Sequence, residues 1–157
     1  AMPNTPALIG AGITGVFATA DVPAEGLAAA TDVLAAAGEI VTCAREAALD
    51  AVTGVSGSGP AYVFYFLEGL TEAAMELGFG EADARKLAYA TFDGAIKLAQ
   101  ASAEEPVTLR ARVTSKGGTT ERAIGELDRA GVKRHFIDAV KAAAARAQEL
   151  GDAAGRE

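Results

Sequence analysis

Residues 55–77 constrain the fold more than any other segment, because they combine a glycine-rich opening with a long apolar run. Residues 56–59, Ser-Gly-Ser-Gly, are expected to form a loop, with Ser58 as the N-cap of a helix. Pro60 suits the first helical turn, where its fixed φ is helical and its missing N–H would have no partner. Residues 61–67 carry no charge, so this part of the helix must be buried on every side. The run is too short to cross a bilayer, which takes about 20 apolar residues, so helices of the same chain or of a second copy must bury it.

The second half of this helix is amphipathic. Glu68, Glu72 and Glu76 recur every four residues and therefore share one face. Gly78 is expected to end the helix, because glycine accepts the backbone conformation that follows a helical C-terminus.

The composition predicts one ordinary globular domain. The chain has 157 residues, of which 50% are hydrophobic and 22% charged, enough to form a core. A net charge of −7 argues against nucleic acid or an anionic membrane as the main partner. Cys43 is the single cysteine, so no internal disulfide is possible, and a reducing cytoplasm is the expected compartment. No secretory signal pattern is expected at the N-terminus.

The remaining pattern predicts a short strand–helix–strand unit followed by helices alone, a mainly α fold class. Strands are expected at residues 13–19 and 39–43 with a helix over residues 21–37 between them, which is too little sheet to be stable by itself. Apolar spacing, prolines and glycines predict further helices at residues 46–52, 60–77, 81–101, 106–113, 119–130 and 132–150. Residues 1–9 are expected to be extended or looped, and residues 151–157 to form a frayed tail.

Residues 10–15 match the glycine pattern G-x-G-x-x-G, but their context argues against a dinucleotide-binding loop. Such a loop needs a strand before it and a helix that opens at its third glycine. Here two prolines, Pro3 and Pro6, lie just upstream, and the residues after Gly15 have strand character. We expect a glycine loop that leads into a strand, with no role in cofactor binding.

Residues 113–120, Val-Thr-Ser-Lys-Gly-Gly-Thr-Thr, form a loop between two predicted helices with the composition of an anion site. Gly117 and Gly118 permit positive φ and close approach of a ligand to the backbone. A helix that opens at Thr119 or Thr120 presents free N–H groups to a carboxylate or phosphate. The alternative is an ordinary glycine turn with a threonine N-cap. Glu121 opposes an anion at this position unless its side chain points outward.

Three motifs together resemble pyrroline-5-carboxylate reductase: MPNTP at residues 2–6, SGSGPAY at residues 56–62 and SKGGTT at residues 115–120. DAVTG at residues 50–54 also resembles the family, and the similarity covers essentially the whole chain in order. The resemblance implies reduction of 1-pyrroline-5-carboxylate to L-proline with NADPH or NADH, and a helical domain that forms an interlocked homodimer. It leaves open whether dimers assemble further into rings.

The resemblance also implies two domains, of which the first is incomplete. Residues 1–45 correspond to the last strand–helix–strand of a Rossmann-type dinucleotide-binding domain, and residues 46–157 to the helical dimerisation and substrate-binding domain. The cofactor would be bound mainly by the part of the first domain that this sequence does not contain, so we expect the chain to be inactive by itself. The alternative hypothesis is a non-catalytic helical dimerisation module derived from the same family.

The resemblance assigns roles residue by residue. Thr120 is the expected catalytic residue, because its hydroxyl would hydrogen-bond the ring nitrogen of the substrate. Asn4 would lie towards the nicotinamide, and no metal site is expected. The substrate carboxylate would lie on the backbone N–H groups of residues 117–120. The expected substrate-binding residues are Glu46, Ser115, Gly117, Gly118, Thr119 and Thr120.

Overall fold

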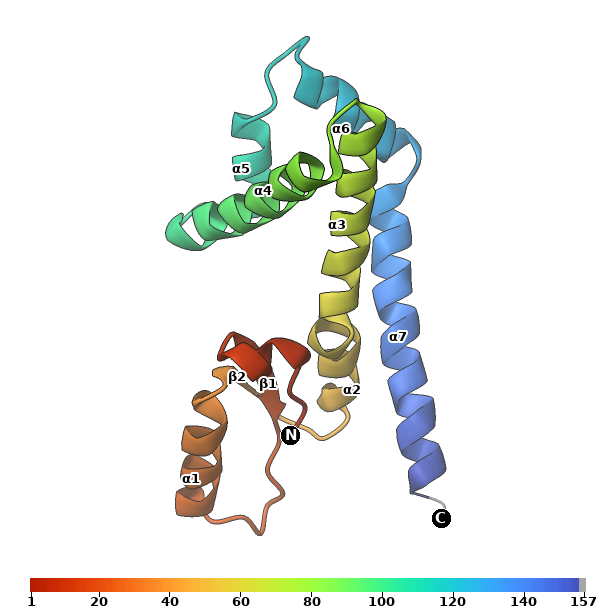
Figure 1. Ribbon diagram of the computed structural model, residues 1–157. Coiled ribbons are helices and arrows are strands. Elements are labelled where there is room, and N and C mark those ends of the chain that lie inside the picture. The colour runs from red at the N-terminus through yellow and green to blue at the C-terminus, as the bar shows by residue number, and fades with distance from the viewer. Residues whose placement is uncertain (156–157) are drawn as a thin grey trace. The chain divides into compact units, whose positions relative to one another are not determined.

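The computed structural model describes residues 1–155 and is mainly helical, with 69% of the chain in helices (Figure 1). The chain divides into two compact units. The first unit comprises residues 1–62 together with the segment from residue 136 onward, and the second comprises residues 63–135. The mainly α fold class with a short strand–helix–strand portion is confirmed.

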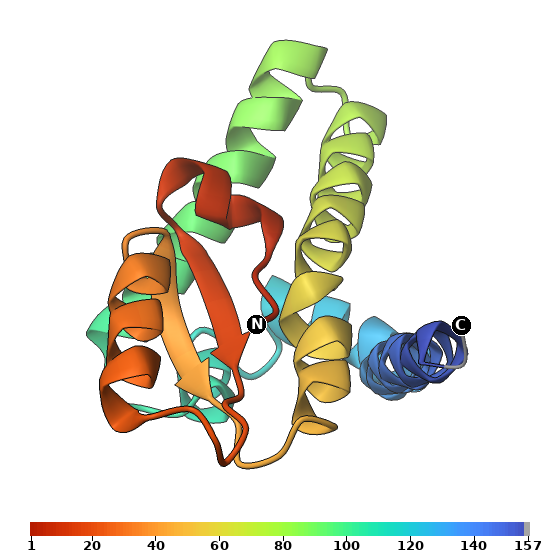
Figure 2. The same cartoon turned by 90° about the horizontal axis from the view of Figure 1, so that it is seen from below.

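The sheet of the first unit consists of two parallel strands, β1 (Gly12–Val16) and β2 (Gly38–Thr42), connected by α1 (Ala24–Ala35). Figure 2 shows the two strands between α1, which lies against β2, and α2 (Ala48–Val52), which lies against β1. The first strand is shorter than predicted. Its last pair is Val16 opposite Thr42, so residues 17–19 have no partner strand on which to continue. The intervening helix also begins later than predicted, because its N-cap, Pro23, is extended with ψ at 151°.

The N-terminal segment corrects one expectation and confirms another. Residues 1–9 are not wholly extended, because η1 (Thr5–Ile9) is a 3₁₀ helix with a proline in its first turn. The glycine pattern at residues 10–15 behaves as expected. Gly10 ends the 3₁₀ helix with φ at 71°, while Gly12 and Gly15 lie within β1 rather than at a helix start. Met2 and Gly15 also form an antiparallel bridge with N···O distances of 2.8 and 3.0 Å.

The serine- and glycine-rich segment before the central helix is helical, which contradicts the predicted loop. A π-helical turn, η2 (Thr53–Gly57), follows α2 directly, and α3 (Gly59–Glu76) begins two residues later. Ser58 has φ −82° and ψ −17°, a helical conformation, so it is not the extended N-cap that we expected. The Tyr62 hydroxyl donates a hydrogen bond to the Gly54 carbonyl oxygen at 2.9 Å.

Gly54 explains how this turn packs within the first unit. It is buried, and a Cβ at this position would lie 2.8 Å from the Ala144 backbone nitrogen and 2.9 Å from the Val140 carbonyl oxygen. Both atoms belong to the backbone of α7 (Val132–Ala154), so only glycine allows this close approach. The ring of Tyr62 also contacts Phe136 edge to face, with ring centroids 5.6 Å apart.

The helices that follow agree closely with the prediction. They are α4 (Glu81–Ala101), α5 (Pro106–Arg112) and α6 (Thr119–Arg129), all in the second unit. Gly78, with φ at 99°, follows the end of α3 as expected. The predicted frayed tail is wrong for residues 151–154, which continue α7, and residues 156 and 157 lie outside the described part of the chain.

The buried core of the described residues is small. Its buried apolar residues are Val16, Cys43, Ala74, Ala84 and Ala88. The uncharged run at residues 61–67, which the sequence required to be buried, is largely exposed: Phe64 is 58% exposed and Tyr65 72%. Helices of the same chain therefore cover this run only in part, since Tyr62 and Leu67 alone are half-buried.

Candidate functional site

The loop between α5 and α6 has a backbone that depends on its two glycines. Gly117 has φ at 74°, in the left-handed region that glycine favours. Gly118 is extended, but a Cβ on it would lie 2.5 Å from the Ser115 hydroxyl oxygen and 3.0 Å from the Ser115 carbonyl oxygen. The chain thus doubles back tightly before α6 begins, so Ser115 and Gly118 are in direct contact.

The start of α6 rules out the threonine N-cap that was the alternative interpretation of this loop. Gly118 is the N-cap, and no side chain caps the helix there. Thr119 and Thr120 are the first two helical residues, and their N–H groups precede the first intrahelical bond, which runs from the Arg122 N–H to the Gly118 carbonyl oxygen at 3.2 Å. The N-terminal end of α6 therefore presents two neighbouring amide donors and the positive end of the helix dipole.

The other two amides of the loop are already bonded within the chain. The Gly117 N–H donates to a Glu121 carboxylate oxygen at 2.7 Å, and the Gly118 N–H donates to the Ser115 carbonyl oxygen at 3.0 Å. Glu121 thus points back into the loop rather than outward. Of the four amides expected to receive a carboxylate, only those of Thr119 and Thr120 remain available.

A shallow, charged hollow of about 440 Å³ adjoins the loop along α6. Glu126 lines this hollow and pairs with Arg122 at 3.0 Å and also with Arg129. Arg112, at the end of α5, pairs with Glu104 at 2.5 Å. Arg112, Arg122 and Arg129 thus each have a carboxylate partner.

The structure gathers five of the predicted site residues in this one loop and places two elsewhere. Ser115, Gly117, Gly118, Thr119 and Thr120 belong to the second unit, with Thr120 half-buried.

Asn4 and Glu46 belong to the first unit. The Asn4 side-chain oxygen accepts a hydrogen bond from the Ile13 N–H at 3.0 Å, which fixes it against β1. Glu46 is exposed in the turn that leads into α2.

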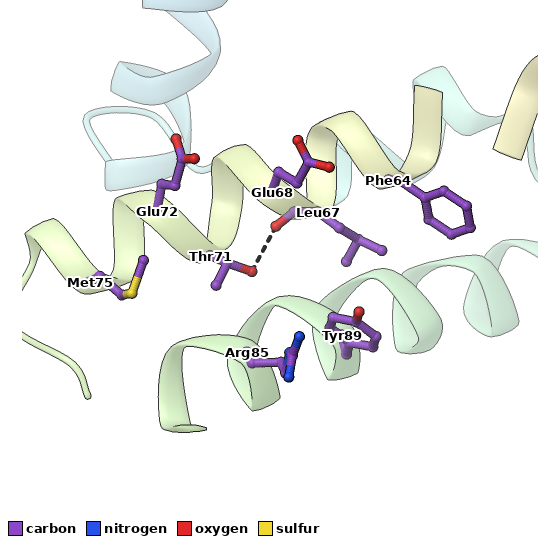
Figure 3. Close-up of a pocket in the computed structure, with 8 residues that line it drawn as sticks. All are labelled: Phe64, Leu67, Glu68, Thr71, Glu72, Met75, Arg85 and Tyr89. Atoms are coloured by element: carbon purple, nitrogen blue, oxygen red, sulfur yellow. Dashed lines mark hydrogen bonds between the residues drawn. The ribbon is translucent and has the colours of Figure 1, made fainter. Parts of the chain in front are cut away.

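A second feature, which the sequence did not reveal, is an apolar groove of about 460 Å³ between α3 and α4 (Figure 3). We call it the α3–α4 groove. The two helices diverge from the turn that joins them (Figures 1 and 2), and the apolar side chains in the groove are Phe64, Leu67, Met75 and Tyr89. Another apolar hollow, of about 490 Å³, includes Tyr65, Phe66 and Phe92. Apolar surface thus borders α3 on more than one side.

The α3–α4 groove also contains charged side chains. Arg85 on α4 lines the groove, whereas Glu68 and Glu72 on α3 point away from α4 (Figure 3). None of these three side chains forms an ion pair with another residue in the described part of the chain. Within residues 1–155, no helix is both long enough and apolar enough to span a membrane.

Fold and site together define a class of protein: a mainly helical domain with an exposed apolar helix and a glycine loop that presents amide donors at a helix start. Residues 46–150 match the family model described as "Pyrroline-5-carboxylate reductase dimerisation". The chain belongs to the pyrroline-5-carboxylate reductase family.

Relatives and solved structures agree with this assignment. The chain is 45% identical to a pyrroline-5-carboxylate reductase of Corynebacterium melassecola, over 96% of this chain and 55% of the relative. It is 42% identical to that of Pseudomonas aeruginosa, over 99% of this chain and 57% of the relative. A Coxiella burnetii reductase structure superposes with a TM-score of 0.90 at 40% identity, covering 95% of this chain and 55% of that one.

A Plasmodium falciparum pyrroline carboxylate reductase solved with NADP bound also has a TM-score of 0.90, at 29% identity, covering 96% of this chain and 61% of that one. The chain therefore spans somewhat more than half the length of the relatives that it matches.

Proposed function

We propose that this chain is the dimerisation and substrate-loop part of a pyrroline-5-carboxylate reductase. The complete protein would reduce 1-pyrroline-5-carboxylate to L-proline with NADPH or NADH, the last step of proline biosynthesis, in the cytoplasm. The proposal is supported by relatives of that name that cover nearly the whole chain, and by the Plasmodium neighbour that binds NADP. A single cysteine fits a reducing compartment.

We assign residues 1–45 to the end of the dinucleotide-binding domain and residues 46–157 to the helical domain. Two parallel strands joined by a helix are the βαβ unit from which such sheets are built, which supports the first assignment. The family model begins at residue 46, which supports the second. The cofactor would be held mainly by residues beyond this chain, with Asn4 as the contribution from this side.

The observation that carries the substrate proposal is the pair of available amides at the start of α6. A carboxylate has two oxygens, and the Thr119 and Thr120 N–H groups are neighbouring donors at the positive end of a helix. The substrate carboxylate would bind there, while Ser115, Gly117 and Gly118 hold the loop in shape. Glu46 is also assigned to substrate binding.

Thr120 would act at the reacting atoms. Its hydroxyl would hydrogen-bond the ring nitrogen and so orient the C=N bond. A bound nicotinamide would supply the hydride to the imine carbon, and the chain's own contribution would be positioning and electrostatics. Loss of the Thr120 hydroxyl would therefore reduce turnover more than it reduces binding of the carboxylate.

The homodimer is supported by the exposed apolar surface of α3. Monomeric proteins rarely expose large contiguous apolar patches, and such patches mark interaction sites. Val63, Phe64, Tyr65 and Phe66 are between 38% and 72% exposed. A second copy packed against α3 would cover these side chains and fill the α3–α4 groove.

The test of the substrate site uses ¹⁵N-labelled chain and L-proline, the proposed product. We expect L-proline to shift the Thr119 and Thr120 amide signals, whereas L-prolinamide, which lacks the carboxylate, leaves them in place. Loop amides that do not respond to L-proline would contradict the substrate site. We also expect no oxidation of NADPH by the chain alone with 1-pyrroline-5-carboxylate. Measurable oxidation would contradict the assignment of cofactor binding mainly to residues beyond this chain.

The same experiment separates the alternative function, a non-catalytic dimerisation module. Such a module would dimerise but would not respond to L-proline. A dimer whose loop amides respond to L-proline supports the enzyme part over the scaffold.

A further inference from the structure

The inference concerns the charges of the α3–α4 groove and rests on the proposed homodimer. Arg85 lies among apolar side chains there and has no ion-pair partner in the described residues. An unpaired arginine is tolerated while the groove is open to water. It becomes costly once another molecule fills the groove and removes that water.

The chain's own acidic residues are turned away from Arg85. Leu67, Thr71 and Met75 are spaced by four residues and form the row of α3 that lines the groove, and Figure 3 shows Thr71 pointing toward α4. Glu68 and Glu72 form the neighbouring row, and their carboxylates point away from α4 (Figure 3). The acidic row therefore faces outward, where it can meet another molecule.

A second copy of the chain fits both features at once. Its α3 presents the same apolar run and the same acidic row, so its apolar side chains match the groove and its carboxylates match Arg85. In a two-fold dimer every contact occurs twice, because the same patch is used on both copies. One arginine per groove would therefore be neutralised in each half of the interface.

We propose that Arg85 forms an ion pair with Glu68 or Glu72 of the partner subunit. This pair, repeated by the two-fold axis, fixes the register in which the two α3 helices associate. The apolar side chains supply most of the contact area. The charge pair selects one arrangement among those that the apolar surface alone would allow, because a misaligned copy would leave Arg85 buried and unpaired.

The test uses charge reversal and mixing, with dimer dissociation constants from sedimentation equilibrium. Arg85→Glu should weaken the homodimer by about 100-fold, because it places like charges together twice. Glu68→Arg and Glu72→Arg are prepared separately. An equimolar mixture of Arg85→Glu with the correct partner variant should form a heterodimer at least tenfold tighter than either variant homodimer, since both pairs are then of opposite charge.

Controls separate register from folding and from net charge. Lys141→Glu makes the same change in net charge at an exposed position of α7 and should leave the dissociation constant within about threefold of wild type. Arg85→Met keeps the packing of the side-chain stem without the charge, and it replaces Arg85→Glu in the dissociation measurements if Arg85→Glu does not fold. The wild-type dimer should weaken as salt rises to about 0.5 M, and the Arg85→Met dimer should respond less.

The outcomes distinguish this inference from the proposed homodimer. Rescue in the mixture supports the ion pair between copies. A double variant in one chain that restores the dimer, together with mixtures that do not, would assign the pair to one chain and overturn the inference. A wild-type dimer whose variants and mixtures all associate normally would also overturn it while leaving the homodimer intact. A wild-type chain that stays monomeric at every concentration would overturn both.

Discussion

At the scale of single residues, the Glu121 carboxylate determines which amides of the substrate loop a ligand can use. It accepts the Gly117 N–H at 2.7 Å and so stabilises a turn in which Gly117 has positive φ. It also leaves a negative charge beside the amides of Thr119 and Thr120. One side chain thus has two opposing effects: it holds the loop in shape, and it repels an anionic ligand.

Two substitutions of Glu121 separate these effects. Glu121→Gln keeps an acceptor for the Gly117 N–H but removes the charge. The Gly117 N–H should therefore stay protected from hydrogen exchange, while L-proline binds more tightly. Glu121→Ala removes both, and Gly117 exchange should accelerate about tenfold, as expected for the loss of one hydrogen bond to a charged group. Amide exchange and L-proline titration by NMR measure both quantities.

The matched control is Asp128→Asn, which removes one exposed negative charge from the other end of α6. It should change neither quantity. Equal Gly117 exchange in wild type and Glu121→Ala would show that the hydrogen bond does not shape the loop.

Gly54 offers a second prediction at the residue scale. In a helix, Gly→Ala ordinarily stabilises by about 1 kcal/mol. At Gly54 the added Cβ would press on the Ala144 nitrogen and the Val140 oxygen, backbone atoms that cannot rotate away. We expect Gly54→Ala to lower the free energy of unfolding by about 1–3 kcal/mol in urea denaturation. Gly151→Ala, in α7 with open space around its Cβ position, should instead be neutral or stabilising, and the same sign for both variants would contradict the packing argument.

At the scale of elements, the π-helical turn η2 is the least regular part of the helical chain, and Tyr62 stabilises it. The Tyr62 hydroxyl bonds the Gly54 carbonyl oxygen, and the ring contacts Phe136 of α7. Tyr62→Phe should keep the ring contact and lose only the hydrogen bond, which lowers the free energy of unfolding by about 1–2 kcal/mol. Tyr65→Phe is the control, since Tyr65 is 72% exposed and its hydroxyl has no hydrogen bond in the described structure. Urea denaturation that ranks the two variants equally would contradict the role of Tyr62.

The sequence predicts some elements well because their ends carry strong local signals. The bounds of α4 and the start of α5 were predicted correctly, since Gly80 precedes the first and Pro106 opens the second. The bounds of β1 and α1 were less accurate, because the length of a strand depends on its partner.

The π turn was not predictable. Residues 56–59 have the composition of a loop, and their helical state depends on Gly54 packing against α7 more than 80 residues later.

The candidate site likewise has features that the local sequence predicts and features that it does not. The loop glycines and the helix start at Thr119 follow from local sequence. The inward orientation of Glu121 does not, because it depends on a side-chain rotamer. The α3–α4 groove and the exposed charge of Arg85 also escaped sequence analysis, since they arise only from the way in which two helices diverge.

At the scale of the whole molecule, the buried apolar core is too small to account for a stable fold by itself. Three of its five members are alanines, and no large side chain is fully buried among the described residues. Large apolar side chains are exposed instead on α3 and on α4, where Leu87 and Tyr89 are about half exposed. A chain of this kind gains much of its hydrophobic stabilisation on association rather than on folding alone.

Stability should therefore depend on protein concentration. When folded dimers unfold to separate chains, mass action raises the midpoint of thermal unfolding as concentration increases. We expect this rise for the wild-type chain in calorimetry over a hundredfold range of concentration. Phe64→Glu, which places a charge in the α3–α4 groove, should lower the midpoint and abolish most of its concentration dependence. Val33→Glu introduces the same charge at a 74% exposed position on α1 and should keep the wild-type dependence. A wild-type unfolding midpoint that does not change with concentration would mean that the small core is enough for a stable fold. A second copy would then not explain the exposed apolar face of α3.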